Sequence, residues 1–188
     1  TCTDLIMRTT TPGTNDTVTP GECAAFRANP DAVGPACGLG GGPVNDDCAD
    51  ALVIGDGVHA YDTTAANLSG VLASGLPAYV AGAPDTACQD FNGAPDDLFN
   101  DVWYLWSPGA TDSYSLSTCD AVDYDSKLAI YTGACGARNA LACNDDALGC
   151  SGFTSLVQVS GITCGSTYLI QVGGFSAADT GMGNLTIS

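Results

Sequence analysis

Acidic side chains occur at two places in the sequence that one hairpin could bring together. A strand-like run over residues 127–132 and a second run ending at Cys143 indicate an antiparallel pair with a turn near Cys135. That turn would place Asp125 opposite Asn144 and Asp145. Calcium prefers hard oxygen ligands, and a bound cation relieves the repulsion between crowded carboxylates. The sequence therefore predicts a calcium site with five ligands: Asp123, Asp125, Asn144, Asp145 and Asp146.

The same side chains have a simpler alternative role. Asp and Asn in turns accept hydrogen bonds from nearby backbone N–H groups and so cap the turn without a metal. The ligand spacing of an EF-hand loop does not occur in the sequence. Calcium binding and turn capping therefore both remain as interpretations of this cluster.

Residues that could support catalysis are sparse. The single histidine, His59, lies in a strand-like stretch with no acid in the spacing of a catalytic dyad. There is no Gly-x-Ser-x-Gly motif, and the glycine run at 38–42 lacks the lysine of a phosphate-binding loop. Paired carboxylates can cleave glycosides, but here they lie in turns, where capping or metal binding explains them more simply. We expect a protein that is not an enzyme and has no catalytic residues.

Short β-strands are the elements that would position these side chains. Strand-like runs alternate with Gly, Pro, Asn and Asp, and no apolar stripe of helical period has a convincing length. The run at 101–106 is apolar on both faces, which predicts a buried central strand with Trp103 and Trp106 in the core. The predicted fold class is all-β, an antiparallel β-sandwich rich in disulfides. The predicted strands are residues 51–54, 58–63, 102–107, 114–118, 127–132, 155–160, 167–172 and 185–187.

The charge balance and the cysteines limit the partners and the compartment. The 188 residues include 21 acidic and 4 basic side chains, which gives a formal net charge of -17. Phosphate backbones and anionic membranes are bound mainly by clustered Lys and Arg, so we expect no nucleic-acid partner and no membrane insertion. Ten cysteines are typical of an oxidising compartment. We therefore expect a secreted protein, extracellular or at a cell surface, from which a signal peptide has been removed.

Residues 1–44 differ in composition from the rest of the chain. They are rich in Thr, Gly and Pro, which favour irregular structure and contribute little to a core. The sequence thus predicts an N-terminal irregular extension over residues 1–44 and one β-domain over residues 45–188. If it is ordered, such an extension must lie against its own domain or against another subunit.

Several motifs follow one another in order through residues 45–188. They are Asn45–Ala51, Asp62–Thr64, Asp101–Tyr104, Ser117–Cys119, Asp125–Tyr131, Cys143–Asp146 and Thr167–Gly174. This series resembles the bacterial pre-peptidase C-terminal-like domains of secreted and surface proteins. The resemblance implies a jelly-roll-like β-sandwich that is itself non-catalytic and is often attached to secreted hydrolases or present in cell-surface proteins. Related collagen-binding modules are known to bind calcium.

The cysteines favour disulfides over a zinc site, because no pair of Cys-x-x-Cys spacings occurs and only one histidine is present. Cys143 and Cys150 bracket a loop that one bridge could close, and Cys119 and Cys135 flank the strand beside it. The resemblance to the pre-peptidase domains implies a third pair, Cys48 with Cys88. The pairing of four cysteines stays open: Cys2, Cys23, Cys37 and Cys164.

Two classes of function remain. The first is a structural or adhesive subunit of an extracellular filament or surface assembly, whose partner is another copy of the chain. In this homopolymer the N-terminal extension would join copies by strand addition or by a disulfide. The alternative is a ligand-binding module for a carbohydrate or a protein polymer, associated with secreted hydrolases. Because the sequence does not clearly show a row of exposed aromatic residues, we favour the first class.

Overall fold

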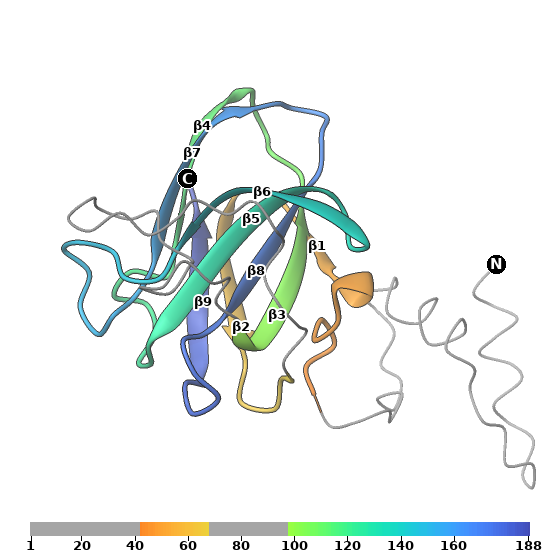
Figure 1. Cartoon of the computed structure of the whole chain (residues 1–188). Coiled ribbons are helices and arrows are strands. Elements are labelled where there is room, and N and C mark those ends of the chain that lie inside the picture. Colours follow the sequence, from red (N-terminus) through yellow and green to blue (C-terminus); the bar gives the residue numbers. More distant parts are fainter. Residues whose placement is uncertain (1–41, 68–97) are drawn as a thin grey trace, which may run out of the picture. The chain divides into compact units, whose positions relative to one another are not determined.

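Short strands make up most of the regular structure in the described part of the chain. The computed structural model describes residues 42–67 and 98–188 (Figure 1). Each of the eight predicted runs is a strand, and the run that ends near Cys143 is a further strand, as the hairpin requires. The elements are a short 3₁₀ helix η1 (Cys48–Asp50) and the strands β1 (Leu52–Ile54), β2 (Gly57–Asp62), β3 (Phe99–Trp106), β4 (Asp112–Ser117), β5 (Ser126–Ala134), β6 (Ala137–Asn144), β7 (Leu156–Ile162), β8 (Tyr168–Gly174) and β9 (Met182–Ile187).

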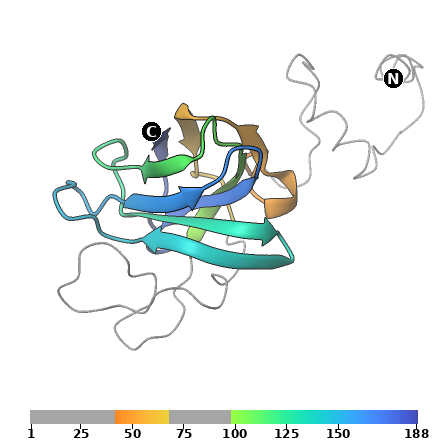
Figure 2. The ribbon, with the colours of Figure 1, turned by 90° about the horizontal axis from the view of Figure 1, so that it is seen from above.

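The strands form two sheets packed face to face. The order is β1-β3-β8-β5-β6 in the first sheet and β2-β9-β4-β7 in the second sheet. Paired strands are antiparallel, except that β1 and β3 pair in parallel. Figure 2 gives a second view, with the β5–β6 hairpin along one side of the sandwich. The predicted all-β class, an antiparallel sandwich, is confirmed.

Strand β3 contributes side chains to both faces of the first sheet. Tyr104 and Trp106 belong to the core between the sheets, and Trp103 belongs to a second apolar cluster. Both tryptophans are fully buried, as predicted. The ring of Trp106 lies 4.8 Å from that of Tyr114, and its Nε1–H donates to Asp56 Oδ1 at 3.0 Å. Neither indole is therefore exposed for stacking on a sugar ring.

The second apolar cluster lies on the outer face of the first sheet and is also buried. Its buried members are Leu98, Trp103, Ala129, Tyr131, Cys143 and Leu169. Tyr131 donates a hydrogen bond of 2.7 Å to Gln171, whose amide donates one of 2.8 Å to Asp101. The guanidinium of Arg138 lies 4.9 Å from the ring of Trp103. Burial of both faces explains why the sequence of β8 is almost continuously apolar.

The disulfides differ from the predicted pairs. Cys48 is bonded to Cys135, and Cys119 is bonded to Cys150. Three predicted pairs are therefore wrong: Cys143–Cys150, Cys119–Cys135 and Cys48–Cys88. The physical reason is that spacing along the chain does not report distance across a sandwich. The turn after β4 is hydrogen-bonded to the β6–β7 loop, for example, and this brings Cys119 to Cys150.

Some predictions fall on residues outside the described ranges. These are nearly all of the extension over residues 1–44 and the cysteines Cys2, Cys23, Cys37 and Cys88. Within the described ranges, Cys143 is disulfide-bonded, and Cys164 is free and exposed. In the same ranges, no helix has the length and apolar character that crossing a membrane requires.

Candidate metal site

The β5–β6 hairpin carries the predicted acidic residues at its open end. Its turn is formed by Cys135 and Gly136, close to the predicted position, because Ala134 pairs with Ala137. The register shifts between Ile130 and Tyr131, so β6 contains one extra residue at that point. The prediction that Asp125 lies opposite Asn144 is wrong by three positions, of which the extra residue accounts for one. Asn144 pairs with Leu128 instead.

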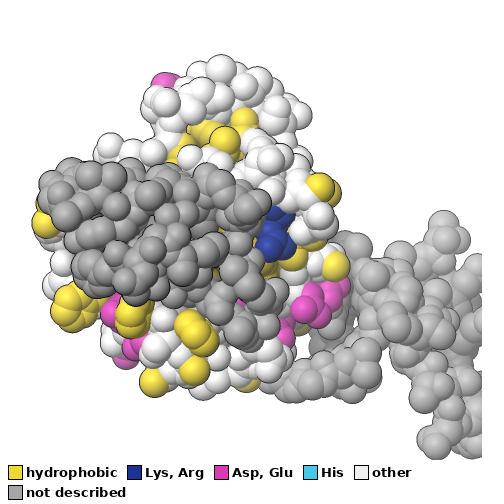
Figure 3. Space-filling model, in the orientation of Figure 1, with side chains coloured by type: hydrophobic (Ala, Val, Ile, Leu, Met, Phe, Trp, Pro, Cys, Tyr) yellow, Lys and Arg dark blue, Asp and Glu magenta, His cyan; other side chains and the backbone are white. Residues whose placement is uncertain are grey.

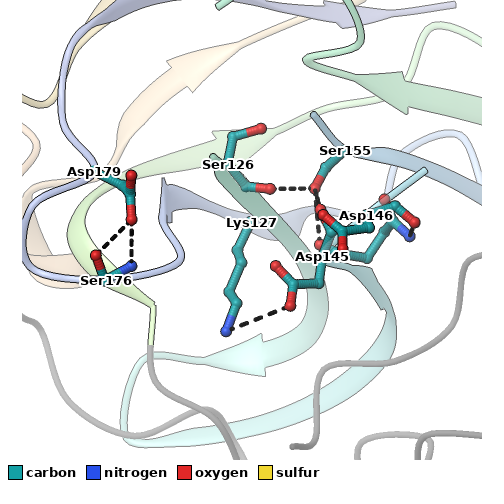
Figure 4. Close-up of polar contacts among 8 residues, drawn as sticks. Ser126, Lys127, Asp145, Asp146, Ser155, Ser176 and Asp179 are labelled. Carbon is teal, nitrogen blue, oxygen red and sulfur yellow. Dashed lines mark hydrogen bonds and ion pairs between the residues drawn. The ribbon is translucent and has the colours of Figure 1, made fainter. Parts of the chain in front are cut away.

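Buried hydroxyl groups hold the backbone around this open end. Ser155 Oγ lies 2.5 Å from the carbonyl oxygen of Ser126, 3.0 Å from that of Asn144 and 2.7 Å from that of Asp145 (Figure 4). Thr118 Oγ1 lies 2.8 Å from Ser126 Oγ. The side-chain oxygen of Asn144 accepts a hydrogen bond of 2.9 Å from the backbone of Leu156. These bonds fix the first residues of the β6–β7 loop against the start of β5.

Three carboxylates meet at this end of the hairpin, and we call them the acidic site: Asp125, Asp145 and Asp146. One oxygen atom from each lies within 4.8 Å of the others. Asp125 and Asp145 are half-buried, and Asp146 is exposed. Asp125 Oδ1 is buried and accepts no hydrogen bond from the described residues. Three like charges this close favour either protonation or a bound cation.

The electrostatics at Asp125 reflect this crowding. Burial first, and then the nearby carboxylates of Asp146 and Asp179, raise the pKa of Asp125 from its usual value to about 6. The ammonium group of Lys127 opposes this rise. Asp179 comes from the β8–β9 loop, where it accepts hydrogen bonds from the backbone and the hydroxyl of Ser176 (Figure 4).

Lys127 lies beside the acidic site. Its side chain is fully buried, and its Nζ lies 3.8 Å from Asp145 Oδ2 (Figure 4). The same nitrogen lies 4.6 Å from the centre of the Phe175 ring. Basic groups are scarce on the surface as well. On the described face in Figure 3, Lys and Arg atoms form one small patch, whereas acidic atoms occur in several places.

Three of the five predicted ligands are thus brought together by the fold, Asp123 is not among them, and the side chain of Asn144 is engaged in hydrogen bonds within the loop. Asp123 is exposed and lies beside Gly181, just before β9. The amide of Asn144 bonds to Leu156 and, at 3.4 Å, to the carbonyl oxygen of Asp146. Asn144 therefore holds the loop, which is the alternative role that the sequence left open.

Two charged neighbours of the site were missed by the sequence analysis. Lys127 is one residue before Leu128 in β5, so the correct hairpin register would have placed it next to Asp145. Asp179 is more than thirty residues further along the chain in another loop, and no sequence pattern connects it to the hairpin. The described His59 lies on β2, where its Nε2 is 2.9 Å from the carbonyl oxygen of Gly55.

Comparisons with known proteins add little to this geometry. No protein-family model and no curated protein matches the chain. Among solved structures, the chain is similar to a Podospora anserina GH26-CBM35 beta-(1,4)-mannanase, with 19% identity and a TM-score of 0.25. The matched part covers 71% of this chain and 28% of that chain. A likeness at this level assigns neither a family nor a function. The resemblance to pre-peptidase C-terminal-like domains stays a prediction.

Proposed function

We propose that residues 45–188 form a non-enzymatic, calcium-binding β-sandwich of the pre-peptidase C-terminal-like kind, within an extracellular structural protein. The observation that carries the proposal is the acidic site. Its three carboxylates have oxygen atoms within 4.8 Å of one another, and Asp125 Oδ1 is buried without a hydrogen-bond donor among the described residues. A bound divalent cation would reduce the repulsion between the carboxylates and would give Asp125 Oδ1 a partner.

The donor set fits calcium better than a transition metal. All three side chains offer hard oxygen atoms, and calcium takes roughly six to eight such ligands, including carbonyl groups and water. The described residues around the site contribute neither histidine nor free cysteine, which zinc would favour. Lys127 compensates for only part of the negative charge, because Asp146 and Asp179 also surround Asp125.

A calcium titration of the full chain tests this proposal. The protein is first treated with a chelator and is then titrated with calcium in a calorimeter, and its melting temperature is measured in both states. Binding to the folded state alone stabilises it by about 2.7 kcal/mol when free calcium is at about 100 times the dissociation constant. Absence of binding heat together with an unchanged melting temperature would reduce the acidic site to turn capping.

The wider role that we propose is a subunit of an extracellular assembly, joined through residues 1–44. One described residue supports it: Cys164 is free and exposed between β7 and β8. The chain has 10 cysteines, an even number, so one cysteine outside the intrachain bridges leaves a second one outside them as well. Two such thiols on each copy would permit head-to-tail linkage in an oxidising compartment.

Electron microscopy and non-reducing gel electrophoresis of the purified chain test this assembly. We expect ladders of disulfide-linked copies that disappear when a reducing agent is added, and that are lost in Cys164→Ser and after deletion of residues 1–44. A protein that stays monomeric under oxidising conditions would remove the assembly role. Binding to an insoluble polysaccharide or to collagen would then be the next measurement.

The alternative role, a carbohydrate-binding or protein-binding module, has less support from the described residues. The exposed large aromatic side chains in this part of the chain are Phe153 and Phe175, and both lie in loops. A flat row of aromatic rings on a sheet face, which would stack on a polymer of sugars, is absent from the described strands.

A further inference from the structure

The buried lysine beside the acidic site has a neighbour with which it could react. Lys127 is one of 4 basic residues in the whole chain, yet its side chain is fully buried. Lysine is almost never buried without a specific partner, because taking its charge out of water is costly. Its Nζ lies 3.8 Å from an oxygen of the Asp145 carboxylate, in a site that also contains the ring of Phe175.

The fold holds these two groups against each other. Leu128 and Asn144 are the last paired residues at the open end of the hairpin, so Lys127 and Asp145 occupy the next positions on two adjacent chain segments. Ser155 Oγ is hydrogen-bonded to the backbone carbonyl groups of Ser126, which directly precedes Lys127, and of Asp145 itself. Two reacting groups held in contact by a rigid backbone gain a large rate advantage over the same groups in solution.

We propose that Lys127 and Asp145 form an intramolecular isopeptide bond in the folded protein. Lys127 Nζ attacks Asp145 Cγ, a new C–N bond forms, and one C–O bond of the carboxyl group breaks. The ammonium group loses two protons, which leave with the departing oxygen atom as one water molecule. No oxidant, cofactor or second protein is consumed, so the reaction needs only the folded chain.

The surroundings supply what the reaction requires. The carboxyl groups of Asp125 and Asp146 lie within 4.8 Å of Asp145 and can carry protons between the nitrogen and the departing oxygen. Burial of Lys127 limits the access of water that would hydrolyse the amide. The bond also replaces a desolvated ion pair with a neutral amide, which removes the cost of burying two charges.

This inference does not depend on calcium. The amide retains the carbonyl oxygen of Asp145 as a hard ligand, so the acidic site could still bind a cation after the bond has formed. The two proposals also have separate readouts, since one is measured as a mass and the other as a binding heat. Either can fail while the other stands.

Mass spectrometry of the full chain, reduced and denatured, tests the bond directly. We expect an intact mass lower than that of the sequence by one water molecule. A protease digest should contain one branched peptide that joins the segment with Lys127 to the segment with Asp145. Loss of water elsewhere, for example by cyclisation of another aspartate, would give no branched peptide.

Matched variants make the result specific to this pair. Lys127→Arg keeps the positive charge but should show the full sequence mass. Asp145→Asn should lose ammonia instead of water and reach the same final mass as the wild type, because the product is the same amide. Asp47→Asn, an exposed residue away from the site, should retain the water loss. A wild-type chain with its full mass and unmodified Lys127 and Asp145 peptides would overturn the proposal and leave an ordinary buried ion pair.

Discussion

The hydroxyl group of Ser155 lies 2.7 Å from the backbone carbonyl oxygen of Asp145. It also lies within hydrogen-bond distance of the carbonyl groups of Ser126 and Asn144, and Ser155 is fully buried. One small side chain therefore connects the start of β5, the end of β6 and the start of the β6–β7 loop. We therefore expect the geometry of the acidic site to depend on this contact.

Ser155→Ala should destabilise the protein and weaken calcium binding together. Removal of the hydroxyl takes away the buried donor that these carbonyl groups share, and the loss of such a donor costs about 1–3 kcal/mol. Urea denaturation in the presence of a chelator measures the first effect, and calorimetry measures the second. Ser160→Ala, at an exposed serine on β7, the strand that Ser155 immediately precedes, is the matched control and should change neither quantity appreciably. Equal effects of the two variants would show that Ser155 does not organise the site.

Asp125→Asn and Asp146→Asn should each abolish most of the stabilisation by calcium. Each change removes one of the three carboxylates while it keeps the size of the side chain. The measurement is the difference in melting temperature between the chelated and the calcium-saturated protein. Asp47→Asn lies outside the site and should retain the full difference. A calcium response that survives in both site variants would place the ion elsewhere.

The contribution of Asp125 to the stability of the calcium-free protein should be lost as the pH rises from about 4 to about 6. The pKa of Asp125 is raised from 3.8 to about 6 in the folded state by burial and by Asp146 and Asp179, against the opposing charge of Lys127. A raised pKa means that the folded state binds the proton more tightly than the unfolded state. The stabilisation that protonated Asp125 provides is therefore complete below pH 3.8 and is lost as the pH rises through the folded-state pKa of about 6.

Asp125→Asn isolates this effect from the other carboxylates. Asp120, for example, has a lowered pKa because Ser151 donates hydrogen bonds to it, so its contribution has the opposite sign and is lost at acidic pH. The free energy of unfolding is measured by denaturant unfolding in chelator at several pH values, for the wild type and for Asp125→Asn. The value for the wild type minus that for the variant should fall between pH about 4 and about 6 and then become constant. A difference that does not change with pH would contradict the assignment.

The two described disulfides should contribute unequally to stability. Cys48–Cys135 closes a separation of 87 residues and Cys119–Cys150 one of 31 residues. On the chain-entropy account, the first bridge contributes about 4.6 kcal/mol and the second about 3.7 kcal/mol. Double Cys→Ser variants of each pair, compared by urea denaturation, should show this order. The reverse order would mean that local strain or residual structure in the unfolded chain, and not loop length, determines how much stability is lost when a bridge is removed.

The strands could be predicted because their signal is local. The runs that contain Trp103 and Ile170 are apolar on both faces and are buried on both faces. The hairpin turn at Cys135 was also predictable, since it lies between two such runs. The single extra residue in β6 opposite Ile130 and Tyr131 was not predictable, and it shifts the pairing at the open end of the hairpin by one position.

The remaining parts of the site depend on contacts between distant segments. Asp179 reaches Asp125 from the β8–β9 loop, and Cys48 reaches Cys135 from the other end of the described chain. Such contacts are set by how two sheets pack, which composition and periodicity do not encode. Lys127 is an intermediate case, because the hairpin register alone would have revealed its position opposite Asp145.

The bond between Cys48 and Cys135 also determines how the module would respond to mechanical tension. A pull on the chain ahead of residue 48 passes through the sulfur atoms to the β5–β6 turn and bypasses the 87-residue separation between them. At roughly 3.4 Å for each extended residue, the oxidised chain withholds about 300 Å of contour length that the reduced chain would release. Tension applied through the N-terminal side would thus reach the first sheet at the β5–β6 turn, while the strands between the two cysteines, β1 to β5, carry none of the extension.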